Sequence, residues 1–115
     1  MRQRYYVLEG HEARAVDDWR EWAAWFEKAD RRVARTTLID GSEVSTVFLG
    51  MDHAWGSGPP VLFETCVFLH EDTEPGDWSD VHARYCTWAE AELGHMNLCE
   101  SLTARLAPWT AKART

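Results

Sequence analysis

The spacing of hydrophobic and polar positions changes along the chain, and each spacing predicts a different kind of element. Residues 4–8, 33–39 and 43–49 are short runs rich in β-branched and aromatic side chains, which is typical of β-strands. The turn sequence Asp-Gly-Ser at 40–42 separates the last two runs, so these runs are predicted to pair as an antiparallel hairpin.

A helix is predicted to begin after Asp18, because Asp18 and Glu21 have the spacing of a capping box. Its bulky residues recur every three or four positions, with Trp25 at the margin: Trp19, Trp22, Ala23, Phe26 and Ala29. Burial of these rings is strongly favourable, so the face is expected to pack into the core rather than serve as an exposed stacking platform.

Residues 61–69 are almost continuously apolar, as expected for a central strand covered on both faces by a helix or by a partner. Glu64 is the exception within this run. Residues 81–86 are predicted to form an edge strand after an acidic loop at 71–80.

A second helix is predicted from Thr87, where Thr87 and Glu90 form another capping box, and it is expected to end near Pro108. Its predicted apolar face consists of Trp88, Ala91, His95, Cys99, Leu102 and Leu106. Together the elements predict one α+β domain over residues 1–115, an antiparallel meander sheet of four to five strands packed by two helices.

Composition narrows the class of protein. Hydrophobic residues make up 45% of the 115 residues and include seven tryptophans, enough to build a core and to favour self-association. The net charge of −7 argues against binding to nucleic acid or to an anionic membrane. No secretory or membrane-spanning apolar run is present, and three cysteines without a CxxC spacing indicate reduced thiols, so a cytosolic location is expected.

The loop at 51–60 concentrates the candidate binding residues. They are an acid, an imidazole, an indole and two glycines: Asp52, His53, Trp55, Gly56 and Gly58. His53 has two interpretations, a general base or ligand-binding group and a structural histidine that holds the loop. Trp55 likewise is either an anchor for a partner or a plug at the end of the core.

Polar groups at apolar positions are the second set of candidates. Glu64 in a central strand needs a partner, and Arg32 or Arg35 on a neighbouring strand is expected to supply it. Arg31 and Arg35 are candidates for binding phosphate. His95 lies on a helix face with Cys99, but no known metal-ligand spacing is present, so neither a metal nor another cofactor is predicted.

The acidic run at 71–80 has five carboxylates and no cation. One interpretation is an ordinary solvated loop, and the other is a docking surface for a basic partner. The residues assigned to that surface are Glu71, Asp72, Glu74 and Asp77.

Four segments carry a resemblance to a known family: residues 22–34, 44–53, 58–65 and 85–95. They resemble a family of small proteins encoded by bacteriophages and prophages, for which no activity, cofactor or catalytic residue is established. The acidic run departs from the family pattern, because relatives have a shorter, glycine-rich connection there. The resemblance therefore implies a setting rather than a mechanism.

Three functions follow as expectations. The first is an accessory protein without enzymatic activity that binds a host protein, as a counter-defence inhibitor of the anti-CRISPR kind does. The alternative is a protein that binds a small molecule or a nucleotide signal in a pocket at the 51–60 loop. The third is a small hydrolase using His53 with Glu64 or His95, for which no nucleophile is convincing.

Overall fold

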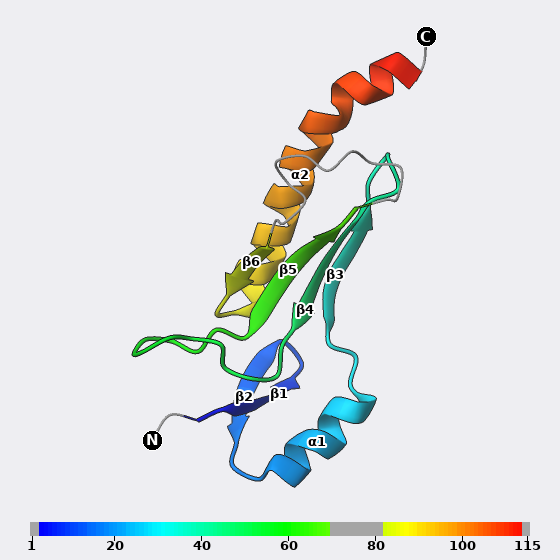
Figure 1. Ribbon diagram of the computed structural model, residues 1–115. Coiled ribbons are helices and arrows are strands. Elements are labelled where there is room, and N and C mark those ends of the chain that lie inside the picture. Colours follow the sequence, from blue (N-terminus) through cyan, green and yellow to red (C-terminus); the bar gives the residue numbers. More distant parts are fainter. Residues whose placement is uncertain (1–2, 70–81, 114–115) are drawn as a thin grey trace.

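The computed structural model describes residues 3–69 and 82–113. The elements in chain order are β1 (Tyr5–Glu9), β2 (Glu12–Val16), α1 (Trp19–Lys28), β3 (Arg32–Thr37), β4 (Glu43–Phe48), β5 (Phe63–Phe68), β6 (His82–Tyr85) and α2 (Trp88–Ala113). They form two antiparallel sheets and two helices, so the predicted α+β class is confirmed (Figure 1).

The larger sheet is a four-stranded antiparallel meander in the order β3-β4-β5-β6. The predicted hairpin is present as β3 and β4, and its turn is closed by a hydrogen bond from the Leu38 amide to the Ser42 carbonyl. Helix α2 lies along one face of this sheet (Figure 1). The core between them forms two clusters, one around Val44 and Leu102 and the other around Phe48 and Ala91.

Strand β5 is central, as predicted, and in the described part of the chain a helix covers only one of its two faces. Residues of β5 alternate: Phe63, Thr65 and Val67 are buried under α2, whereas Phe68 on the other face is 60% exposed. The run is apolar at positions on both faces of the strand, including Phe68, and this pattern indicated burial on both faces. Helix α2 covers only the face of Phe63, Thr65 and Val67.

Strand β2 was missed, because most of its side chains are exposed and its sequence is half polar. It pairs with β1 in a separate two-stranded sheet, with Tyr5 opposite Val16. The hairpin docks at Gly50, whose carbonyl accepts hydrogen bonds from the Tyr6 amide and from Trp22 Nε1. Gly50 has a φ of +77°, and an added Cβ would press on Phe26, so this junction requires glycine.

Helix α1 begins as predicted, with the Asp18 side chain accepting a hydrogen bond from the Arg20 amide. The helix lies against β1 and β2, and Trp25 reaches Phe48 of the larger sheet. The expectation that Trp19 belongs to a buried face is wrong, since Trp19 is 56% exposed. A two-stranded hairpin is too narrow to cover the whole aromatic face of this helix.

Helix α2 has the predicted cap, in which Thr87 Oγ1 accepts from the Glu90 amide. Its predicted apolar face is confirmed, with Ala91, His95 and Leu102 buried against the sheet. The expected end near Pro108 is wrong, because the helical backbone continues to Ala113. Proline removes one backbone donor from a helix but does not always end it. Among the described helices, none has the length and apolar character of a membrane span.

At Gly94, helix α2 approaches the sheet closely. A Cβ at Gly94 would lie 2.4 Å from the ring of Tyr85, which is itself packed against the second core cluster. We therefore expect Gly94→Ala to lower the free energy of unfolding by about 1–3 kcal/mol through overpacking, although alanine is the better helix former. Denaturant unfolding checks this, with the exposed Asn97→Ala in the same helix as the control. A stabilised Gly94→Ala variant would contradict the close approach.

Candidate functional site

The 51–60 loop is fixed at its base by Asp52. Asp52 Oδ1 accepts hydrogen bonds from the Ala54 amide (2.8 Å) and from the Val61 amide (2.9 Å), which joins the two ends of the loop. The His53 amide adds a bond to the Val61 carbonyl. These bonds hold the loop as a closed projection beside the sheet (Figure 1).

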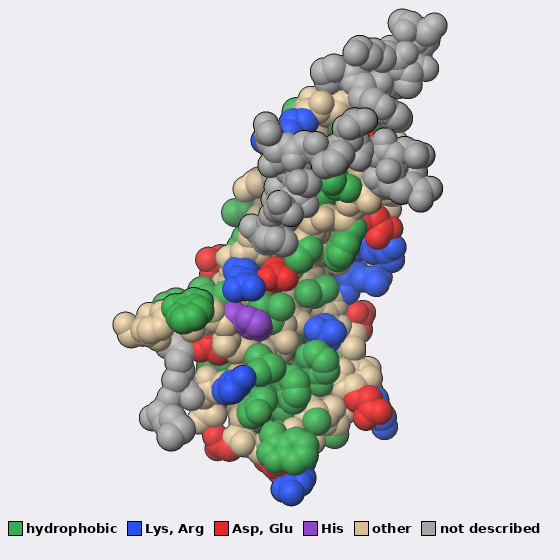
Figure 2. Space-filling view, viewed as in Figure 1, with side chains coloured by type: hydrophobic (Ala, Val, Ile, Leu, Met, Phe, Trp, Pro, Cys, Tyr) green, Lys and Arg blue, Asp and Glu red, His purple; other side chains and the backbone are tan. Residues whose placement is uncertain are grey.

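The tip of this loop presents side chains to solvent. Trp55 is 94% exposed, so the interpretation as a plug of the core is wrong. His53 is also exposed, while Gly56 and Gly58 have φ values of +73° and +122° that favour glycine. The space-filling view shows this loop standing out from the body of the molecule (Figure 2).

Glu64 is paired, but not with the expected residue. Arg84 of the adjacent strand β6 donates from Nε to Glu64 Oε2 at 2.8 Å, because β5 and β6 place the two residues opposite each other. Arg32 and Arg35 are on β3, separated from β5 by β4, so the predicted pairing with either is wrong. Glu64 also accepts from Cys66 Sγ.

The thiols of Cys66 and Cys86 have little nucleophilic character. Burial, followed by the neighbouring Glu64 carboxylate, raises the pKa of Cys66 to about 11. Burial and the charges of Glu90 and Asp52 also raise the pKa of Cys86. Both side chains are therefore protonated at neutral pH, whereas a nucleophilic cysteine needs a lowered pKa.

The two candidate phosphate-binding arginines, Arg31 and Arg35, are each engaged by groups of the protein itself. Arg31 donates to the Phe48 carbonyl and lies 4.0 Å from the ring centre of Phe26. Arg35 forms an ion pair with Glu43 on the adjacent strand β4. These contacts are of the kind that hold strands and helices in place.

His95 is 4% exposed and lies between α2 and the sheet. Its Nε2 is 2.8 Å from Thr36 Oγ1 and its Nδ1 is 2.7 Å from Thr46 Oγ1, which also bonds Thr65 Oγ1. Both ring nitrogens thus have protein partners, a structural arrangement. Among residues 3–69 and 82–113, no group of three or more His, Cys, Asp or Glu side chains could hold a metal ion.

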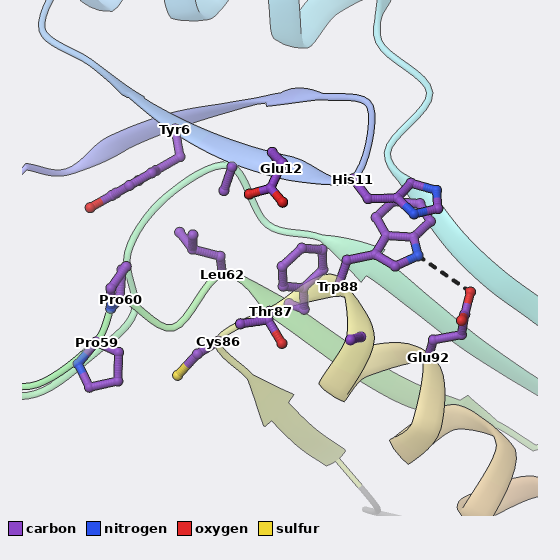
Figure 3. Close-up of a pocket in the computed structure, with 13 residues that line it drawn as sticks. Tyr6, His11, Glu12, Pro59, Pro60, Leu62, Cys86, Thr87, Trp88 and Glu92 are labelled. Carbon is purple, nitrogen blue, oxygen red and sulfur yellow. Dashed lines mark hydrogen bonds between the residues drawn. The ribbon is translucent and has the colours of Figure 1, made fainter.

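A pocket of about 520 Å³ lies where the β1–β2 hairpin, the end of the 51–60 loop and the start of α2 meet (Figure 3). The hairpin contributes Tyr6, His11 and Glu12. The loop and the chain after it contribute Pro59, Pro60 and Leu62, and the region around the start of α2 contributes Cys86, Trp88 and Glu92. Of the candidate residues Asp52, His53, Trp55 and Glu64, none lines this pocket.

Two contacts shape the helix side of the pocket. The ring of His11 stacks on Trp88 with centroids 3.8 Å apart and planes 7° from parallel. Trp88 Nε1 donates to Glu92 Oε2, the bond drawn in Figure 3. His11 and Tyr6 were not identified as candidates from the sequence, because the pairing of β1 with β2 was not predicted. Of the features noted in the 51–60 loop, its tandem prolines, Pro59 and Pro60, are the residues that line the pocket.

Glu71, Asp72, Glu74 and Asp77 lie outside the described residues, so the structure assigns them no geometry. Comparison of the chain with models of protein families, with curated proteins and with solved structures gives no match. The resemblance to bacteriophage and prophage proteins therefore stays a prediction.

The buried ring of His95 makes stability depend on pH. Burial lowers the pKa of His95 below its ordinary value, because the interior disfavours the charged ring. The unperturbed pKa of histidine is about 6.5, and above this pH the stability that depends on the neutral ring is fully present. This stability is lost as the pH falls through the lower pKa of His95 in the folded state. We expect the free energy of unfolding to decrease over that range, and denaturant titrations from pH 8 to pH 5 measure it. His95→Gln should be less stable but lack this decrease; an unchanged pH slope would contradict the assignment.

Proposed function

We propose that this chain is a binding protein without enzymatic activity that engages a protein partner through the 51–60 loop. The observation that carries the proposal is Trp55, which is 94% exposed on a loop tied together by Asp52. Tryptophan is enriched among residues that dominate binding energy, and a nearly fully exposed indole contributes little to the fold that displays it.

The fixed base of the loop favours tight binding. A loop that is already ordered loses less conformational entropy when it binds than a flexible loop does. The bonds from Asp52 to the Ala54 and Val61 amides supply this order at both ends of the loop. The base of the loop that carries Trp55 is then ordered before a partner arrives.

The partner that we propose is a host protein with a basic surface, and the action is that of a counter-defence inhibitor of the anti-CRISPR kind. The net charge of −7 and the acidic run at 71–80 support a basic partner, since opposite charges speed association. Occupying a basic surface would keep nucleic acid from it. Self-association of the chain stays a prediction.

The geometry is less favourable to the hydrolase. Glu64 is engaged by Arg84, and His95 is buried with both nitrogens bonded to threonine hydroxyls. A general acid or base must reach a substrate, and neither group does so in this arrangement. Binding of a small molecule is favoured by a separate observation, the pocket beside the β1–β2 hairpin.

Trp55→Ala tests the proposal. We expect the variant to bind the partner about 30-fold more weakly, a loss of about 2 kcal/mol that is usual for an anchoring residue. The free energy of unfolding of this variant should equal that of the unmodified protein within about 0.5 kcal/mol, because the Trp55 side chain is exposed. Affinity capture from host lysate, quantified by mass spectrometry, identifies the partner, and surface-based binding kinetics then measure the affinity. Trp19→Ala is the matched control, an exposed tryptophan on α1; equal binding by both variants would refute the role of the loop.

The acidic run is tested by removing its charge. Replacement of Glu71 and Glu74 by Gln and of Asp72 and Asp77 by Asn should lower the association rate and flatten its dependence on salt. The dissociation rate should change little, since contacts of the Trp55 loop are retained. Association rates measured at two salt concentrations check this, and rates equal to those of the unmodified protein would show that the run is an ordinary solvated loop.

A further inference from the structure

The pocket beside the β1–β2 hairpin has a mostly apolar wall, and its charged groups are negative. Most of its wall is aromatic, aliphatic or proline, including Tyr6, Pro60 and Leu62. Its charged lining residues among those described are two carboxylates, Glu12 and Glu92, with no lysine or arginine. A mostly apolar wall with a few placed polar groups is typical of a small-molecule site, and about 520 Å³ is within the usual range of such sites.

Glu12 is the group that points to the ligand. In the view of Figure 3, the Glu12 side chain on β2 lies between Tyr6 and His11 and above Leu62, in the pocket wall. Among the described residues, no hydrogen bond or ion pair reaches Glu12, whereas Glu9 at the other side of the turn is engaged by Arg14 and Glu92 by Trp88. An apolar pocket with an unpaired carboxylate at its opening favours a cation.

An anionic ligand fits less well. The first turn of α2 begins at the pocket, but its exposed amides are partly satisfied by the Thr87 hydroxyl, which accepts from the Glu90 amide. Glu90 adds negative charge at this helix terminus, where the helix dipole would otherwise attract an anion. Arg31 and Arg35, the groups expected to bind phosphate, do not line the pocket.

We propose that this pocket binds a small organic cation, an ammonium group carried on a flat apolar body. The ammonium lies at Glu12, with the carboxylate of Glu92 adding to the negative potential. The apolar body lies against Tyr6, Pro60 and Leu62, where an aromatic face also attracts a cation. Trp55, the proposed protein anchor, does not line this pocket, although Pro59 and Pro60 at the end of the same loop do, so the ligand and the partner use different residues of the loop.

Three probes with the same phenylethyl body and different charge test the proposal: 2-phenylethylammonium, 2-phenylethanol and 3-phenylpropanoate. Titrations of the intact protein followed by NMR, using the indole N–H signal of Trp88 as a reporter, give the three dissociation constants. We expect the cation to bind about tenfold more tightly than the alcohol, and the anion to bind most weakly. Equal affinities of cation and alcohol, or a preference for the anion, would overturn the proposal.

Two variants locate the site. Glu12→Gln should weaken binding of the cation about fivefold and leave binding of the alcohol unchanged, while Glu27→Gln, an exposed carboxylate on α1, is the matched control. Ala89→Phe, on the exposed side of α2 and in the pocket wall, should fill the space and abolish binding of all probes. Cation binding that survives Ala89→Phe, or that is equally weakened by Glu27→Gln, counts against the pocket.

The same variants separate this proposal from the protein-binding function. Glu12→Gln and Ala89→Phe should capture a protein partner as the unmodified chain does, whereas Trp55→Ala should retain the affinity for 2-phenylethylammonium. Loss of cation binding in Trp55→Ala would contradict a cation site that does not include Trp55. Thermal unfolding of each variant confirms that the fold is intact before binding is compared.

Discussion

The packing of α2 on the four-stranded sheet holds the other parts of the molecule in place, and its center is polar. Thr36, Thr46 and Thr65 on three strands meet His95 of the helix through hydroxyl and imidazole hydrogen bonds. In the described part of the chain, no buried side-chain nitrogen or oxygen lacks a hydrogen-bond partner. Because an unpaired polar group in this interface is costly, a helix shifted by one residue would leave several groups unsatisfied. The network therefore selects one position for the helix, and Gly94 lets it approach Tyr85 closely in that position. The start of α2, and with it one wall of the pocket, is fixed as a result.

Regular patterns made much of the fold predictable from sequence. The β3–β4 hairpin has a clear turn sequence, and the caps at Asp18 and Thr87 are local signals read without knowledge of tertiary contacts. Predictions of side-chain burial were wrong where burial depends on tertiary packing. Trp19 is exposed because the β1–β2 hairpin is narrow, and Phe68 is exposed because helix α2 covers only one face of the sheet. Neither fact is encoded in the local spacing of side chains.

The candidate site was predictable in part. The 51–60 loop stood out by its mixture of residues, and the role of Asp52 at its base depends on contacts only nine residues apart. The pairing of Glu64 with Arg84 depends instead on which strand adjoins β5, which no local pattern reveals. The pocket is still less local, because it joins residues from the start, middle and end of the chain. Its unpaired carboxylate belongs to β2, an exposed strand whose sequence gives a weak signal.

The junction at Gly50 gives the pocket a further property. The β1–β2 hairpin is joined to Gly50 by the hydrogen bond from the Tyr6 amide, and at the pocket to α2 by the stack of His11 on Trp88. Small units with few buried contacts open by local unfolding at less cost than the core does. Opening of the hairpin removes one wall of the pocket, so a ligand held there binds only the closed form. Its occupancy therefore suppresses local opening and slows amide hydrogen exchange in β1 and β2 by mass action, without any change in the structure of the sheet and α2.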